Sequence, residues 1–257
     1  MLSNGKAAFK FLLLFVWMGV WFIFLTLAYR LRKYTLRDHV MRLSSAGILW
    51  IIGVRVNVTG VPGAERPLLL VSNHVSYLDV LILNSKAHIH FTPKIEIDGW
   101  PFMKSVARMS GSVYVERRAD KISDGRDKLA VALEKGDMVC LFPEATTGSG
   151  LHLLPFKSSF FSLAEQAIGG RELTVQPVAL TYTAIRRLPI DTTQWPHVAW
   201  YGDMSMLPHL WNLLKLTPLT AELAFLSPTT LRQHGDRKKL AAHCRLVIEE
   251  AIQTIRH

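Results

Sequence analysis

The feature that most constrains this chain is an uncharged apolar run near its N-terminus, "FLLLFVWMGVWFIFLTLAY", which covers residues 11–29. As a helix this run is about 28 Å long, close to the hydrocarbon thickness of a bilayer. A cleaved signal peptide is the alternative, but its apolar region is shorter and no small-x-small cleavage site follows here. We therefore expect the run to attach the chain to a membrane. Basic residues flank it on both sides: Lys6, Lys10, Arg30, Arg32, Lys33 and Arg37.

A second apolar stretch, "AGILWIIGV" (46–54), follows a basic amphipathic segment, "LRDHVMRLSS" (36–45). It is too short to span a bilayer, so we expect either the return arm of a helical hairpin dipping into one leaflet or a core helix. The sequence does not separate a spanning first helix from a half-inserted one. The basic flanks predict that the rest of the chain stays on the cytoplasmic side. We accordingly divide the chain into membrane-anchoring helices, 1–53, and a second domain, 54–257.

The composition restricts the partners of the chain. Among its 257 residues the formal net charge is +10, which favours anionic partners such as phosphate groups, acidic proteins and anionic lipid headgroups. Nucleic acid is not expected, because no block of basic residues with interleaved aromatic stacking positions occurs. Cys140 and Cys244, the two cysteines, provide neither a disulfide framework nor a metal-binding pattern and are expected to be buried thiols.

Beyond residue 54 short apolar runs alternate with helical segments, which predicts an α/β sheet that is at least partly parallel. Helices are expected at "ADKISDGRDKLAVALEKG" (119–136), at "SSFFSLAEQAIGG" (158–170) and at about 236–256. The expected strands are "VRVNV" (54–58), "PLLLVS" (67–72), "HIHFT" (88–92), "SVYVE" (112–116), "MVCLF" (138–142), "LTVQPVAL" (173–180), "HVAWY" (197–201) and "TAELAF" (220–225).

The heptapeptide "NHVSYLD" (73–79) follows one of these expected strands and places His74 five residues before Asp79. In one regular helix the two side chains would diverge by about 140°. They can meet only if His74 lies on a loop and Asp79 lies inside the helix that follows, an arrangement that orients an imidazole. The structural alternative is a capped helix start, with Ser72 or Asn73 as the cap.

Three further segments carry unusual residues where a strand is expected to end. "GSVYVERR" (111–118) ends in two arginines, "LFPEATTGSG" (141–150) offers Glu144 after a proline, and "VQPVAL" (175–180) has a proline inside an apolar run. In open α/β sheets the ligand crevice lies at the carboxyl ends of the strands. These segments therefore favour a site that combines them with "NHVSYLD".

Several other classes of site lack their motifs. The chain contains no G-x-S-x-G elbow, so Ser76 lacks the strained turn of a hydrolase nucleophile. It contains no phosphate-binding G-x-x-x-x-G-K-[ST] and no H-E-x-x-H. His88 and His90 would share one face of a strand, but a third metal ligand is not evident, so packing is the preferred interpretation.

Taken together, four blocks resemble the membrane-associated 1-acylglycerol-3-phosphate acyltransferase family. The family's N-H-x-x-x-x-D, G-x-[FIV]-[FIV]-x-R, F-P-E-G and proline-centred apolar blocks are matched in order by Asn73 to Asp79, Gly111 to Arg117, Phe142 to Ala145 and Val175 to Val178. The resemblance covers about residues 55–230. It implies a mixed, largely parallel sheet flanked by helices, with 54–257 as the catalytic domain, and transfer of an acyl group from a thioester to a lysolipid hydroxyl.

The resemblance also implies roles for single residues. His74 would be the general base, since an unperturbed imidazole titrates near pH 6.5, and Asp79 would orient it. Arg117 would bind phosphate and Glu144 would help to hold the polar acceptor, while Lys94 would add positive charge. Other residues of these blocks expected at the substrate are Gly111, Pro143, Thr146 and Thr147. No cofactor or metal is implied; the co-substrate is an acyl carrier protein or coenzyme A thioester.

Two departures from the family pattern bear on the acceptor. Ala145 replaces the glycine of F-P-E-G, and Thr147 stands where an arginine is common. Threonine there, together with "WYGDMSMLPHLWNLL" (200–214), resembles a bacterial branch that acylates lyso-ornithine lipid. Lysophosphatidate is nevertheless our first expectation, with lyso-ornithine lipid as the alternative, at the cytoplasmic face of a bacterial inner membrane. A membrane-bound lipid or thioester hydrolase and a non-catalytic module for anionic membranes or nucleic acid are the other hypotheses.

Overall fold

The computed structural model describes residues 4–87, 89–91, 105–106, 108–110 and 122–256. Its helices are α1 (Asn4–Arg30), α2 (Tyr34–Ile52), α3 (Leu78–Lys86), α5 (Ile122–Glu134), α6 (Met206–Leu216), α7 (Leu231–His234) and α8 (Arg237–Arg256), with the 3₁₀ helices η2 (Ser158–Glu165) and η3 (Trp195–His197). Its strands are β1 (Val54–Thr59), β2 (Leu68–Ser72), β3 (His90–Phe91), β4 (Val139–Leu141), β5 (Thr174–Ile185), β6 (Leu188–Pro189), β7 (Leu219–Phe225) and β8 (Thr229–Thr230).

The strands of the described residues form one sheet with the order β1-β7-β5-β2-β4-β3, and β6 and β8 pair with β5. The pairs β1–β7, β5–β2, β2–β4 and β4–β3 are parallel, whereas β5 runs antiparallel to β7, β6 and β8. This confirms the predicted mixed, largely parallel sheet. Pro177 fits inside the long strand β5 because it lies between the stretch paired with β8 and the stretch paired with β7.

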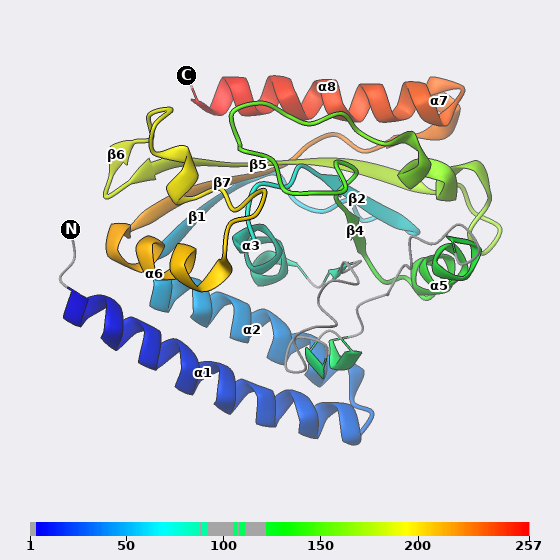
Figure 1. Ribbon diagram of the computed structural model, residues 1–257. Helices are drawn as coiled ribbons and strands as arrows, with labels where there is room; N and C mark the ends of the chain where they lie inside the picture. The colour runs from blue at the N-terminus through cyan, green and yellow to red at the C-terminus, as the bar shows by residue number, and fades with distance from the viewer. Residues whose placement is uncertain (1–3, 88, 92–104, 107, 111–121, 257) are drawn as a thin grey trace.

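Helices cover both faces of the sheet (Figure 1). The helix α8 lies along one face, and α3, α2, α1 and α6 lie on the other. The sequence of α8 explains its position, because its apolar residues recur every three or four positions and so form one stripe. That stripe is buried and consists of Leu240, Ala241, Cys244, Ile248 and Ile252.

The two N-terminal helices form an antiparallel hairpin (Figure 1). They pack closely where Trp17 of α1 meets Gly47 of α2, since a Cβ at position 47 would lie 2.1 Å from the indole ring. Lys10 donates hydrogen bonds to Ile52 O at 2.7 Å and to Thr217 Oγ1 at 2.9 Å. These bonds link α1 to the last residue of α2 and to the residue that follows α6. The second apolar stretch is thus part of a helix that serves as the return arm and also packs on the core.

By its length and composition the helix α1 could cross a membrane. Among the described residues, no other helix is long and apolar enough to do so. Only 17% of the residues in its most apolar window are buried. Its outward side chains are large and hydrophobic, as Phe15 and Ile23 illustrate with 70% and 68% of their surfaces exposed. A helix of this kind is not the core helix of a soluble domain, because a core helix buries its apolar side chains.

Two predicted elements are wrong. "HVAWY" (197–201) is not a strand: it begins in η3 and continues without regular structure, although Val198 and Ala199 are fully buried. "SSFFSLAEQAIGG" (158–170) does not form an α-helix but the 3₁₀ helix η2, followed by a bridge between Ile168 and Arg171. In both cases an apolar pattern correctly indicates burial and fails to indicate backbone conformation. The predicted strand "SVYVE" and the outer residues of "HIHFT" lie outside the described residues.

Candidate active site

The site begins where β2 leaves the sheet. Its five residues are fully buried, and Asn73 follows at once with 1% of its surface exposed. The Asn73 side chain donates to Leu180 O at 2.8 Å and accepts from Leu180 N at 2.9 Å, both on the neighbouring strand β5. The amide side chain thus replaces two backbone partners of β5, so the backbone of the next residue is free to turn out of the sheet.

His74 and Asp79 meet in the geometry that their spacing predicts. His74 lies on the loop between β2 and α3, Asp79 lies in the first turn of α3, and His74 Nδ1 donates to Asp79 Oδ2 over 2.9 Å. Asp79 is fully buried, whereas 18% of the His74 side chain is exposed. The structural alternative of a simple capped helix is wrong in one respect: α3 begins at Leu78 after Tyr77, and neither Ser72 nor Asn73 caps it.

The Asp79 carboxylate is held by three further donors. Its Oδ2 also accepts from the backbone amides of Val75 at 2.7 Å and Ser76 at 2.8 Å. Its Oδ1 accepts from the Tyr182 hydroxyl at 2.5 Å. Burial, and then the Asp79 charge, raise the pKa of Tyr182 well above its ordinary value, so this hydroxyl keeps its proton and remains a donor. Four hydrogen bonds compensate the cost of removing the carboxylate from water.

Glu144 is the third predicted site residue that the fold brings here. Its Oε1 accepts from the His74 backbone amide at 2.7 Å, and its Oε2 accepts from the Leu154 amide at 2.9 Å. The carboxyl is almost fully buried, and this burial raises its pKa from 4.5 to about 7, although both amide donors favour the charged form. Glu144 therefore joins the loop after β4 to the His74 loop while its own charge titrates near neutrality.

The loop 143–150, which contains Glu144, makes a tight turn. Ala145 occupies the left-handed region with φ 64°, which explains why the family pattern has glycine there. The Gly148 amide donates to His74 O at 2.8 Å, and Pro143 O accepts from Lys157 N at 3.0 Å. Thr146 is exposed and Thr147 is partly exposed. Pro143 thus links this loop to Lys157, and no described hydrogen bond of Pro143, Thr146 or Thr147 reaches His74 or Asp79 directly.

Aromatic rings and a second segment fix the remaining side of the loop. The His74 ring stacks on Phe142 with ring centroids 4.0 Å apart and planes 15° apart. The Trp200 amide donates to Val75 O at 2.9 Å, and the Tyr77 hydroxyl lies 3.1 Å from His209 Nδ1 of α6. The stretch 200–214, which we associated with acceptor choice, therefore contacts the His74 loop through Trp200 and His209.

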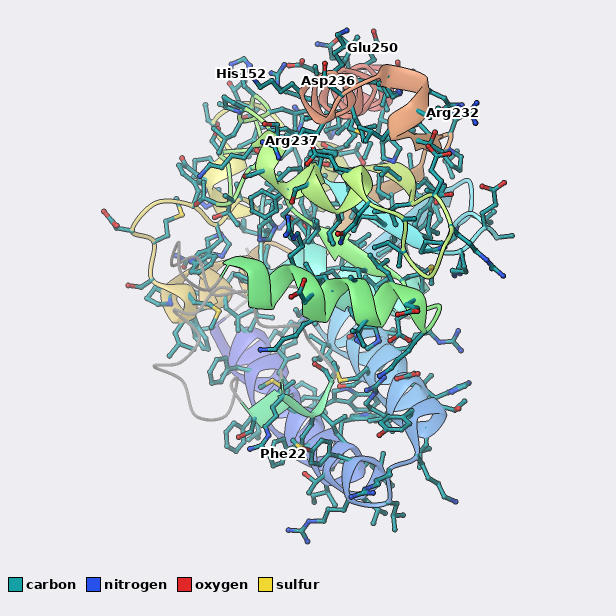
Figure 2. All side chains as sticks on the ribbon, turned by 90° about the vertical axis from the view of Figure 1, so that its right-hand side faces the viewer. Phe22, His152, Arg232, Asp236, Arg237 and Glu250 are labelled. Carbon is teal, nitrogen blue, oxygen red and sulfur yellow. The ribbon has the colours of Figure 1, made fainter. Side chains whose placement is uncertain are left out.

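A cavity of about 70 Å³ opens beside His74. Within the described residues, His74 Nε2 makes no hydrogen bond, while Nδ1 is occupied by Asp79. Residues from three segments surround the cavity: the His74 loop, the stretch from Glu144 to Leu153, and the C-terminal half of α8. Figure 2 shows one of them, His152, near α8 at the end of the molecule farthest from α1.

Three predicted site residues, Lys94, Gly111 and Arg117, lie outside the described residues. For the part of the chain that the structure covers, no group of three or more His, Cys, Asp or Glu side chains is placed to hold a metal ion. Both cysteines are buried, and burial raises the pKa of each thiol, that of Cys244 to about 12. Neither thiol is therefore suited to act as a nucleophile.

From the sequence, Asn73 had a role only as a possible helix cap, and no role was indicated for Tyr182 or Arg256. Asn73 stood inside the matched block, so the motif itself could have indicated it. Tyr182 reaches Asp79 from β5, 103 positions away, and Arg256 reaches the cavity from the last helix. Only the pairing of β2 with β5 and the packing of α8 bring these two residues to the site.

These contacts define what the site can do chemically. An imidazole with one nitrogen fixed to a buried carboxylate and the other facing a cavity can take up a proton and stay oriented while it does so. Ser76 is fully buried, so the site lacks an exposed serine beside the imidazole within the described residues. The arrangement suits a bound hydroxyl, not a side chain of the protein, as the nucleophile.

Comparison with known proteins identifies relatives over most of the chain. The model of the acyltransferase family matches residues 55–181. A lyso-ornithine lipid O-acyltransferase of Brucella abortus is 36% identical over 74% of this chain and 73% of its own, and that of Rhizobium meliloti is 35% identical over 74% and 67%. A 1-acyl-sn-glycerol-3-phosphate acyltransferase of Neisseria meningitidis is 30% identical over 81% and 77%.

A solved structure shows the same fold. The crystal structure of the 1-acyl-sn-glycerophosphate acyltransferase PlsC from Thermotoga maritima superposes with a TM-score of 0.66, covering 96% of this chain and 97% of that protein. The sequence identity between the two is 15%, so this similarity concerns the fold alone.

Proposed function

Because the chain belongs to the acyltransferase family, we propose that it moves a fatty acyl group from a thioester to the free hydroxyl of a lysolipid in membrane lipid biosynthesis. The observation that carries this proposal is the His74 ring, with Nδ1 bonded to buried Asp79 and Nε2 facing the cavity. A hydroxyl is a poor nucleophile near neutral pH and needs a base of this kind.

The proposed reaction uses His74 twice. Nε2 accepts the proton of the lysolipid hydroxyl as its oxygen attacks the thioester carbonyl, which forms a new C–O bond and a tetrahedral intermediate. The intermediate then expels the thiolate as the C–S bond breaks, and the thiolate takes the proton from the imidazolium. Asp79 stabilises the imidazolium between these steps. The reaction needs neither a cofactor nor a covalent acyl-enzyme.

Two acceptors are candidates, and different observations favour each. The blocks around His74 and Glu144 resemble those of lysophosphatidate acyltransferases, and the Neisseria meningitidis relative is a 1-acyl-sn-glycerol-3-phosphate acyltransferase. Thr147, in the place of a common arginine, and the two relatives at 35–36% identity favour lyso-ornithine lipid. We now place lyso-ornithine lipid first, because removing a cation from the site weakens recognition of a phosphate more than that of a zwitterionic headgroup.

The proposal extends to the surroundings of the reaction. The hairpin in residues 1–53 attaches the enzyme to the bacterial inner membrane, with the catalytic domain, 54–257, on the cytoplasmic face. The supporting observations are the exposed apolar side chains of α1 and its basic flanks. The donor is an acyl carrier protein or coenzyme A thioester, and a chain of net charge +10 suits either anion. Arg117 and Lys94 are proposed to contribute positive charge to the site.

A lysolipid panel tests the proposed function. Membranes containing the protein are incubated with a radiolabelled acyl thioester and with lysophosphatidate, lyso-ornithine lipid or lysophosphatidylethanolamine. We expect label in the diacyl product of lyso-ornithine lipid, with lysophosphatidate next. Acylation of lysophosphatidate alone would reverse the order of the two acceptors. Label that appears only as free fatty acid, whichever lysolipid is present, would replace the transferase with the hydrolase hypothesis.

A further inference from the structure

The C-terminal helix sends an arginine into the site. Arg256, in the last turn of α8, lines the cavity together with His74 and Glu144. Its Nη2 donates to Gly150 O at 2.7 Å and to Thr181 Oγ1 at 2.8 Å, and its Nε donates to Thr181 Oγ1 at 3.0 Å. The guanidinium carbon lies 4.3 Å from the centre of the Trp195 ring. Four contacts therefore fix the position of this cation.

Arg256 has no carboxylate partner among the described residues, although it is partly buried. The hydrogen bonds on its Nε and Nη2 go to a neutral hydroxyl and a neutral carbonyl, and its Nη1 makes none within the described part of the chain. A guanidinium removed from water without a counter-charge is costly, and its burial lowers the pKa of Arg256. A ligand that carries an anion would relieve this cost.

The other charged groups around the cavity are already engaged. Glu249 is bound by Arg245, with Nη1–Oε2 at 3.2 Å and Nη2–Oε1 at 3.3 Å. Glu144 accepts the backbone amides of His74 and Leu154. Among the described residues that line the cavity, Arg256 is the one lysine or arginine. Arg256 is therefore the guanidinium that lines the same cavity as the proposed base and keeps a nitrogen, Nη1, without a hydrogen bond among the described residues.

The size and position of the cavity suit a lipid headgroup. A volume of about 70 Å³ holds a polar group equivalent to a few water molecules and does not hold an acyl chain. The apolar hairpin lies on one face of the sheet and α8 on the other, as Phe22 and Glu250 mark in Figure 2. A lysolipid whose chain extends from the hairpin side and whose hydroxyl meets His74 directs its headgroup towards α8.

Arg256 also explains the departure at position 147. The loop that lacks the common arginine, with Thr147 in its place, is the loop whose Gly150 carbonyl binds Arg256. A cation from the far end of the chain thus reaches the same loop. Gly150 permits this approach, because at φ 81° it packs so tightly that a Cβ there would lie 2.5 Å from the Trp195 ring.

We propose that Arg256 binds the acidic group of the lysolipid headgroup, either the phosphate of lysophosphatidate or the carboxylate of lyso-ornithine lipid. This inference rests on the proposed function for the identity of the ligand. It assigns recognition of the headgroup to the C-terminal helix, in addition to the blocks shared with the family. Arg256 is a binding residue in this account and takes no part in proton transfer.

Binding measurements test this inference without turnover. Calorimetry on the intact protein in detergent gives Kd for lysophosphatidate, lyso-ornithine lipid and the neutral monoacylglycerol of the same chain length. We expect Arg256→Gln to raise Kd about 10-fold or more for the acidic lysolipids and to leave the neutral one unchanged. The matched control is Arg237→Gln, at the exposed start of the same helix, which should change none of them. The acidic lysolipid that loses more identifies the anion, phosphate or carboxylate.

Several outcomes would overturn the inference. Unchanged Kd values in Arg256→Gln would do so, as would an equal loss for all three lysolipids, which indicates that Arg256 only holds the Gly150 loop. If Arg256→Gln does not fold, Arg256→Lys replaces it; an ammonium lacks the guanidinium fork, so a loss of a few fold confined to acidic lysolipids is expected and no loss is contradictory. Selective binding of acidic lysolipids without any acyl transfer would support Arg256 and remove the proposed function.

Discussion

The His74 loop and the α1–α2 hairpin distribute polar and apolar groups in opposite ways. Around His74 the polar side chains are inside: Asn73 and Asp79 are buried, and each of their buried oxygens accepts a hydrogen bond. On the hairpin the hydrocarbon is outside, and Trp50 of α2 exposes 77% of its surface. The buried side chains of Asn73 and Asp79 find their hydrogen-bond partners within the protein, whereas the exposed hydrocarbon of the hairpin would be removed from water only by an apolar partner. An enzyme that joins an acyl chain to a polar acceptor needs both kinds of region.

The largest expected effect comes from altering the charge inside the loop. Asp79→Asn keeps an oxygen for the amides of Val75 and Ser76 and turns its new NH₂ towards the Tyr182 oxygen, so the fold should persist. The negative charge that we propose to stabilise the imidazolium is lost, and acyl transfer should fall by about 10²- to 10⁴-fold. Initial rates of diacyl lipid formation measure the loss.

The exposed Asp127 on α5 provides the matched control, since Asp127→Asn removes the same charge from the surface. Its rate should equal that of the wild type. A normal rate in Asp79→Asn would show that the buried charge does not support the imidazole.

The hairpin is tested by placing charge on its apolar surface. Phe15→Lys with Ile23→Lys should release most of the protein from membranes, because each lysine at the centre of a membrane helix costs about 2.5–3.5 kcal/mol. Both side chains are exposed, so the rest of the fold should keep its stability. Flotation with vesicles containing anionic lipid measures the bound fraction. Val131→Lys with Leu246→Lys adds the same charge at exposed apolar positions of the other helices and should leave binding unchanged; equal binding by both double variants would refute the anchor.

The burial of Glu144 should make the free energy of unfolding depend on pH. Its folded-state pKa, about 7, lies above the ordinary 4.5, so the folded state holds a proton that the unfolded state has released between these values. The free energy of unfolding should therefore fall by about 3 kcal/mol as the pH rises from 4.5 to 7 and change little above that range. Denaturant unfolding at several pH values should show this fall in the wild type and not in Glu144→Gln.

Other carboxyl groups add their own slope, so the quantity to compare is the difference between wild type and variant. The exposed Glu250 of α8 supplies a control, and Glu250→Gln should keep the wild-type slope. A Glu144→Gln protein with the same pH dependence as the wild type would show that this carboxyl is not destabilised by burial.

The smallest expected effect concerns the backbone conformation of Ala145, the residue after Glu144. Ala145 has φ 64°, a conformation that costs an L-residue about 1 kcal/mol and a glycine almost nothing. Ala145→Gly should therefore raise the free energy of unfolding by about 0.5–1 kcal/mol. Ala242→Gly, at an exposed position inside α8, should lower it by about as much. Destabilisation in both variants would show that Ala145 is not strained.

The sequence predicted the sheet well because its strands are short apolar runs bounded by turns. The two elements that were predicted wrongly, 158–170 and 197–201, are equally apolar, but their backbones do not form the hydrogen bonds of the predicted helix and strand. Val198 and Ala199 are as buried as a strand, yet they pack beside the His74 loop and the neighbouring Trp200 amide pairs with Val75 O outside the sheet. Apolar composition indicates burial, and only the available backbone partners decide between strand and turn.

The same distinction applies to the site. The pairing of His74 with Asp79 follows from local spacing and was predictable from seven residues. Tyr182 depends on β5 lying beside β2, and Arg256 depends on where α8 ends on the sheet. Neither relation leaves a local pattern in one sequence. The roles of all the predicted site residues stay predictions, and Lys94, Gly111 and Arg117 also lie outside the described residues.

The fate of the acyl group in the wild type and in His74→Ala tests the proposed role of His74 as the general base most directly. A labelled acyl thioester is supplied with one accepted lysolipid, and diacyl lipid and free fatty acid are quantified together while membrane binding and thermal unfolding are monitored. We expect the wild type to form diacyl lipid in proportion to the lysolipid, and His74→Ala to lose this by at least about 10²-fold while remaining folded and membrane-bound. Diacyl lipid formation at a near-normal rate by the folded His74→Ala protein would contradict the account.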